Sequence, residues 1–196
     1  FTLSSHLSGS YNSAELGKKL YHEKYGDKNI FVCDSESASC GETQLAFKTV
    51  EWSKEGCSFE EICQRLMEYR DKMKTYFVLD NLETLRKNGR LTGIKAFVAT
   101  TLNIKPVMSA TKGVIIQIGQ AIGTQKALAK MAETVARESV HPEEKMLMIT
   151  HCNCRERAEK VKEMILEKIR VKDVLIMDTK GVSSMYANDG GVIVTL

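Results

Sequence analysis

Apolar and polar residues follow one another along the first part of the chain with helical spacing. This spacing predicts helices at 9–25, 43–54 and 58–73, and a short apolar run at 29–33 predicts one strand between the first two. The apolar positions of the first helix are expected on one face: Ala14, Leu16, Leu20, Tyr21 and Tyr25. The first 73 residues are therefore predicted to hold three helices and very little strand.

The rest of the chain is richer in strands. Short apolar runs predict them at 75–79, 105–108, 113–118, 146–150, 174–177 and 191–195. Helices are predicted between them, namely a short one ending at Lys87 and longer ones at 94–102, 124–137 and 155–169. We expect the last strand to close the sheet, and Ala127, Met131 and Val135 to share one helix face. Strands alternating with helices favour an α/β architecture.

Polar residues mark where several elements begin. Ser58 and Glu61 form the S-x-x-E pattern of a capping box, and Asp80 opens a second one ending at Glu83. Asp34, Asp80 and Asp178 each follow a predicted strand, where a carboxylate can face a cleft or cap a helix. For Asp80 we predict the capping role.

The change in pattern near residue 73 predicts two domains without a linker rich in proline or glycine. The first residues already lie within a structural element, and the first part lacks strands for a complete sheet. We therefore predict that residues 1–73 are the remainder of a truncated N-terminal α/β domain, and that residues 74–196 form a C-terminal α/β domain. As an alternative to a place within the C-terminal domain, the final strand is expected to pack at the domain interface.

Composition narrows the class of protein. The 196 residues are 43% hydrophobic, enough for a substantial core, and 28 basic against 25 acidic residues give a net charge of only +3. Lys and Arg lie mostly beside Glu, which argues against a nucleic-acid surface, and no apolar run approaches the roughly 18 residues of a membrane span. The six irregularly spaced cysteines favour reduced cytosolic thiols, with a small metal site at His151, Cys152 and Cys154 as an alternative.

Candidate chemistry begins in the serine-rich segment after Leu3. A short apolar lead, hydroxyl residues around Gly9 and a helical pattern indicate a tight loop at a helix start. Backbone N–H groups and the helix dipole favour an anion there, and the hydroxyls of Ser8 and Ser10 can add hydrogen bonds. The alternative is an ordinary serine cap, which contributes about 1 kcal/mol.

Other candidates are weaker. Ser8 lacks the G-x-S-x-G frame of a hydrolase nucleophile, and His6 two residues earlier shows only that both side chains face one side. Residues 119–123 lack the nucleotide-binding motifs. Arg90 follows the turn residues Asn88 and Gly89, where an arginine is either solvated or a partner for a carboxylate or phosphate.

Four stretches together resemble the DegV family. They are L-S-G-S-Y-N-S-A at 7–14, D-S-E-S-A-S at 34–39, Y-F-V-L-D-N-L-E-T-L-R-K-N-G-R-L at 76–91 and L-N-I-K-P-V at 102–107. They occur in the family's order and spacing over nearly the whole chain. Members of the family are bacterial fatty-acid-binding proteins, including the subunit that presents fatty acids to a fatty acid kinase.

The resemblance implies two α/β domains with a long-chain fatty acid between them, its tail in an apolar tunnel. It implies that Ser8 bonds the carboxylate, that the Gly9 N–H assists and that Arg90 lies near the head group. It also implies a cytoplasmic carrier without a cofactor, whose partner kinase performs the catalysis. The alternative function is a hydrolase or phosphotransferase that uses the Ser8 loop.

The sequence departs from the family pattern in two places. The family's N-terminal segment, with its first strands and a threonine ligand to the carboxylate, is expected to be missing. The His-x-Gly-Pro-Gly motif near the C-terminus is also replaced, since residues 186–191 read Y-A-N-D-G-G without a histidine. These departures concern the head-group contacts and the presentation to a kinase.

Overall fold

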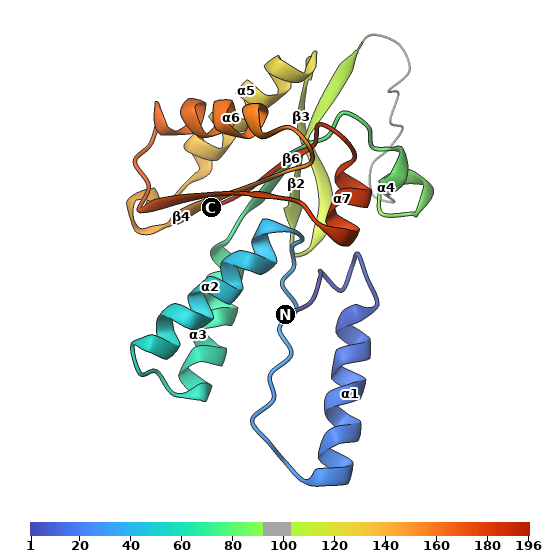
Figure 1. Cartoon of the computed structure of the whole chain (residues 1–196), viewed down its shortest axis with the longest axis vertical. Helices are drawn as coiled ribbons and strands as arrows, with labels where there is room; N and C mark the ends of the chain where they lie inside the picture. Colours follow the sequence, from blue (N-terminus) through green and yellow to red (C-terminus); the bar gives the residue numbers. More distant parts are fainter. Residues whose placement is uncertain (92–102) are drawn as a thin grey trace. The chain divides into compact units, whose positions relative to one another are not determined.

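A computed structural model describes residues 1–91 and 103–196 of this chain. It has a mixed α/β architecture and divides into two compact units (Figure 1). The first unit comprises Phe1–Met73 with Lys112–Val114, and the second comprises Lys74–Thr111 with Ile115–Leu196. The helix predicted at 94–102 lies outside the described residues.

The first unit contains the three helices that the sequence predicts. They are α1 (Ser10–Tyr25), α2 (Cys40–Lys54) and α3 (Phe59–Lys72), so that α2 begins at Cys40 rather than Thr43. The capping box of α3 is confirmed. Ser58 Oγ accepts from the Glu61 N–H at 3.2 Å, and Glu61 Oε2 accepts from the Ser58 N–H at 2.8 Å.

The core of the first unit is small. Cys33, Leu45 and Leu66 are buried together, and the rings of Trp52 and Tyr69 pack edge to face beside them. Among the described residues α1 has no buried side chain. Its expected apolar face stays accessible to solvent, with Leu16, Leu20 and Tyr25 more than half exposed.

The strand predicted at 29–33 is wrong. Among the described residues, this segment makes no strand ladder, and only an isolated parallel bridge joins Thr2 to Asp34 just after it. The Thr2 N–H donates to the Cys33 carbonyl at 3.0 Å, and the Ser35 N–H donates to the Thr2 carbonyl at 3.3 Å. An apolar run becomes a strand only where a neighbouring backbone pairs along its length.

The second unit is built on a six-stranded sheet with the order β3-β2-β1-β6-β4-β5. Its strands are β1 (Thr75–Val78), β2 (Ile104–Thr111), β3 (Val114–Ile122), β4 (Met146–His151), β5 (Asp173–Asp178) and β6 (Val192–Thr195). The β4–β5 pair is parallel, whereas β6 runs antiparallel to both of its neighbours. The last strand therefore does not close the sheet but occupies a central position. Val192 and Val194, which share one face of this strand, are buried, and so is Thr195 on the other face, as suits a strand that is covered on both sides.

Two amphipathic helices cover this sheet. They are α5 (Thr124–Glu138) and α6 (Arg155–Leu166), which pack against each other and against β1, β2, β4 and β5 (Figure 1). The predicted face of α5 is confirmed, because Ala127, Met131 and Val135 are fully buried in the main core. No described helix combines the length and apolar character that crossing a membrane requires.

Short elements complete the second unit at the ends of its strands. They are α4 (Glu83–Lys87), a 3-10 turn (Pro142–Glu144) and α7 (Gly181–Ala187). The sequence pattern does not predict α7, which begins with glycine and contains two adjacent serines, all weak helix formers.

The predicted capping role of Asp80 is wrong. The side chain of Asn81 instead accepts from the Glu83 N–H at 2.7 Å, at the start of α4. Asp80 accepts from Arg157 Nη1 at 2.6 Å and from Thr124 Oγ1 at 2.7 Å. Partial burial alone would raise the pKa of Asp80, but the hydrogen bonds from Thr124 and Arg157 and the nearby positive charges hold the pKa below its usual value.

We expect this lowered pKa to make the second unit sensitive to acid. Because the Asp80 pKa is lower in the folded state than in the unfolded chain, its contribution to stability is present above about pH 4 and is lost as the pH falls through the folded pKa. In urea unfolding, the free energy of unfolding should fall less between about pH 7 and about pH 3 in Asp80→Asn than in the wild type. The exposed Glu133→Gln serves as control, and an unchanged slope in Asp80→Asn contradicts the expectation.

Candidate functional site

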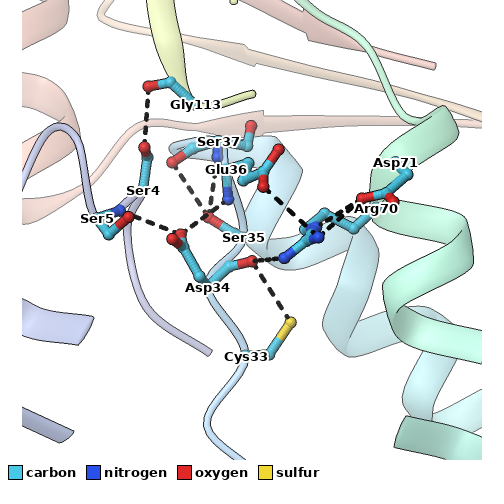
Figure 2. Close-up of polar contacts among 10 residues, drawn as sticks. All are labelled: Ser4, Ser5, Cys33, Asp34, Ser35, Glu36, Ser37, Arg70, Asp71 and Gly113. Carbon is cyan, nitrogen blue, oxygen red and sulfur yellow. Dashed lines mark hydrogen bonds and ion pairs between the residues drawn. The ribbon is translucent and has the colours of Figure 1, made fainter. Parts of the chain in front are cut away.

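Two loops of the first unit lead into helices and lie side by side. The Ser4–Gly9 loop precedes α1, and the Asp34–Ser39 loop precedes α2. The Asp34 carboxylate joins them, because its Oδ1 accepts from the N–H groups of Ser5 and Glu36, each at 3.1 Å (Figure 2). One side chain therefore satisfies backbone donors in both loops.

Buried serine hydroxyls reinforce this junction. Ser4 is fully buried, donates through Oγ to the Gly113 carbonyl at 2.9 Å and accepts from the His6 N–H at 3.2 Å. Ser35 is also fully buried and exchanges two hydrogen bonds of 3.1 Å with the backbone of Ser37 (Figure 2). The hydroxyls of Ser4 and Ser35 both donate to backbone carbonyls, so they have a structural role.

Arg70 of α3 stabilises the Asp34–Ser39 loop through a hydrogen bond and an ion pair. Its Nη1 donates to the Asp34 carbonyl at 3.4 Å, and its Nη2 lies 3.5 Å from Glu36 Oε1 (Figure 2). Glu36 and Ser39 both have positive φ values, of 49° and 58°, which side chains other than glycine seldom adopt. The contacts of Arg70 and Asp34 therefore stabilise a backbone conformation that is locally unfavourable.

Ser8 is held in an orientation that suits an anion. Its Oγ accepts from the Ser10 N–H at 3.2 Å, and its own N–H donates to the Ser4 carbonyl at 3.0 Å. Because the Ser10 N–H occupies a lone pair of Ser8 Oγ, the Ser8 hydroxyl proton is available for another acceptor. Gly9, the exposed N-cap residue of α1, has open space where a Cβ would stand.

The hydroxyl of Ser10 adds to this site. Its Oγ is buried but has no hydrogen-bond partner within the part of the chain that the structure describes. Buried hydroxyls are normally hydrogen-bonded. Ser8 and Ser10 therefore flank Gly9 at the N-terminus of α1, and no described residue accepts a hydrogen bond from either hydroxyl.

Arg90 belongs to the second unit, whereas Ser8 and Gly9 belong to the first. The Arg90 N–H donates to the Leu85 carbonyl at 2.8 Å, which fixes the turn after α4. Gly89 adopts a φ of 71° in this turn, and Arg90 Nη1 donates to the Asn88 carbonyl. The turn predicted at Asn88–Arg90 is confirmed, while the role of Arg90 in binding stays a prediction.

Among the described residues, the side chains of the alternative hydrolase and metal sites do not converge on one point. His6 is exposed, and among the described residues no hydrogen bond joins its side chain to Ser8. His151 Nδ1 accepts from the Cys154 N–H at 3.3 Å, and its Nε2 lies 3.4 Å from Asp178 Oδ1. Burial raises the pKa of the Cys154 thiol, which disfavours the thiolate that a metal requires.

Comparison with known proteins agrees with the motifs. A profile of the family described as "Uncharacterised protein, DegV family" matches residues 1–195. The chain belongs to the DegV family. A DegV domain-containing protein of Clostridium perfringens is 34% identical over 174 residues, which cover 88% of this chain and 60% of the relative. Another from Streptococcus gordonii is 33% identical over 193 residues, covering 98% of this chain and 68% of the relative.

Solved DegV structures share the fold. A Ruminococcus gnavus protein refined with vaccenic acid is 54% identical with a TM-score of 0.97, covering all of this chain and 70% of its own. A Eubacterium eligens protein loaded with heptadecanoic acid is 28% identical with a TM-score of 0.89, covering 99% of this chain and 70% of its own. The Streptococcus pneumoniae fatty acid kinase (Fak) B3 protein, loaded with linoleic acid, is 29% identical with a TM-score of 0.87, covering 99% and 69%.

The DegV relatives are longer than this chain, which spans 60% of the C. perfringens protein and about 70% of the solved ones. The truncated N-terminal domain stays a prediction. What the comparisons do confirm is the family and the mixed α/β fold.

We expect Asp34→Ala to loosen both loops of the first unit, because two backbone N–H groups lose their acceptor. The free energy of local opening should fall by about 1–2 kcal/mol, and the amides of Ser5 and Glu36 should exchange hydrogen faster. Asp34→Asn keeps an oxygen acceptor and should be affected less. Asp27→Ala, at a fully exposed carboxylate, is the control. Unchanged exchange at Ser5 and Glu36 in Asp34→Ala would show that Asp34 does not hold the loops.

Proposed function

We propose that this chain binds a long-chain fatty acid and presents it to a fatty acid kinase, without catalysing the phosphorylation itself. The fatty-acid carboxylate is received by Ser8 and Gly9 at the N-terminus of α1, and Arg90 is a further partner of the head group. The observation that carries this proposal is that, in residues 1–91 and 103–196, no group accepts a hydrogen bond from the hydroxyls of Ser8 and Ser10. The solved DegV relatives with vaccenic, heptadecanoic and linoleic acids support it.

The chemistry of these residues fits a carboxylate. The Ser8 hydroxyl and the N–H groups at the start of the 16-residue α1 are donors, and the helix dipole adds partial positive charge. The guanidinium of Arg90 offers a planar fork that matches two carboxylate oxygens. A tail of about C16–C18 would contribute through burial, at roughly 0.8 kcal/mol per CH₂.

Calorimetric titration of the delipidated protein with a saturated C18 acid and with its methyl ester tests this function. Saturable binding of the acid, at least about tenfold tighter than that of the ester, is expected because the ester lacks the carboxylate charge. Absence of binding by either ligand contradicts the carrier function, and equal affinities contradict a carboxylate site. Release of the free acid from the ester would instead support the hydrolase.

We expect Ser8→Ala to weaken fatty-acid binding by about 1–3 kcal/mol, because a bound carboxylate loses a donor. Calorimetry measures the change in dissociation constant. Ser13→Ala is the matched control, since Ser13 is an exposed serine on the same helix. If Ser8→Ala binds as tightly as Ser13→Ala, Ser8 is not a ligand.

Arg90→Ala should also weaken binding, and Arg90→Lys should recover only part of the loss, because an ammonium cannot reproduce the forked geometry. The control is Arg86→Ala on α4, whose guanidinium is paired with Glu83 at 2.7 Å. The affinity of each variant for the C18 acid is measured by calorimetric titration and compared with that of the wild type. Equal affinity of Arg90→Ala and wild type would leave Arg90 with a turn role only.

A further inference from the structure

The loop between α7 and β6 is tied to the segment that follows β1. One tie runs through Arg157, whose Nη1 donates both to Asp80 Oδ2 at 2.6 Å and to the Gly190 carbonyl at 2.8 Å. Gly190 has a φ of 86°, and a Cβ at this position would stand 2.4 Å from Asp80 Oδ2. The close approach of Asp80 and Arg157 therefore requires glycine in this loop.

Asn188 makes the second tie with its side-chain amide. Its Nδ2 donates to the carbonyls of Asn81 at 3.2 Å and Tyr186 at 3.1 Å, and its Oδ1 accepts from Thr84 Oγ1 at 3.3 Å. Both donors and the acceptor of the amide are thus engaged. The residue has a φ of 54° and a ψ of 172°, a conformation that glycine adopts far more readily than other residues.

These contacts continue from Asn188 to Arg90. Thr84, which donates to Asn188, offers its own carbonyl to Asn88 Nδ2 at 2.8 Å. The Asn88 carbonyl in turn accepts from Arg90 Nη1. An unbroken series of hydrogen bonds therefore links the amide of Asn188 to the guanidinium of Arg90 through Thr84 and Asn88.

The helix in the middle of this series needs such support. At five residues, α4 is far shorter than the roughly 12–15 residues at which an isolated helix becomes marginally stable in water. Buried Leu82 and Leu85 fix its inner side. Asn188 and Asn81 fix its N-terminal end, and the backbone bond from Arg90 to Leu85 closes its C-terminal end.

We propose that Asn188 is a positioning residue for Arg90: it fixes α4 through Thr84 and thereby holds the Arg90 guanidinium, which the proposed function makes a partner of the fatty-acid carboxylate. This inference rests on the proposed function. It assigns a role to a residue in the stretch 186–191, where the sequence lacks the family's histidine motif. Asn188 acts here through Arg90 and does not itself contact the ligand.

Asn188→Gly is the test variant, because glycine accepts the left-handed backbone while the amide is removed. Its matched control is Asn153→Gly, an exposed asparagine at a φ of 53° in the loop between β4 and α6. In titrations with a C18 acid, we expect Asn188→Gly to weaken binding about three- to tenfold and Asn153→Gly to leave it unchanged. In an Arg90→Ala background, Asn188→Gly should cause no further loss.

The coupling between the two sites separates a positioning role from a general structural one. Unchanged affinity in Asn188→Gly, or the same loss with and without the Arg90 side chain, overturns the inference. If Asn188→Gly fails to fold, Thr84→Val removes the hydroxyl that donates to Asn188, at nearly constant side-chain volume. A loss of affinity in Thr84→Val that disappears in the Arg90→Ala background supports the inference, and an equal loss in both backgrounds overturns it. Failure of the wild-type chain to bind the acid would instead contradict the proposed function.

Discussion

The first unit depends on the pairing of one carboxylate with the backbone of two loops. Asp34 accepts from N–H groups in both the Ser4–Gly9 and the Asp34–Ser39 loops, while Arg70 braces the second of them. The positive φ values of Glu36 and Ser39 are locally unfavourable, and these contacts help to hold the loop in that conformation. The hydroxyls of Ser8 and Ser10, for which the described part of the chain offers no acceptor, lie on the segment that this pairing holds in place.

In the second unit, side-chain hydrogen bonds likewise hold the segment that follows β1. Asp80 and Asn81 serve different partners. Asp80 binds Arg157 and Thr124, while Asn81 accepts from the Glu83 N–H through its side chain and from Asn188 through its carbonyl. A helix as short as α4 derives its position from these neighbours rather than from its own propensity. The proposed head-group arginine thus depends on residues far from it in the sequence.

Local patterns predicted what local interactions determine. The Ser58 capping box and the buried face of α5 follow from spacing alone, and the four family motifs identified the DegV family. The role of Asp80 could not be predicted, because Arg157 lies 77 residues away. The predictions of a strand at 29–33 and of a last strand that closes the sheet were wrong, because sheet pairing is decided between segments, not within them. Ser8, Gly9 and Arg90 stay predictions as ligand-binding residues.

The proposed binding of a fatty acid can be tested by native mass spectrometry of the protein, purified from bacteria without added lipid. We expect a protein peak accompanied by an adduct with the mass of a C16–C18 acid (about 250–290 Da), lost on collisional activation and weaker in Ser8→Ala. A spectrum with only the bare protein, even after incubation with an excess of a C18 acid, would show that this chain is not a fatty-acid carrier.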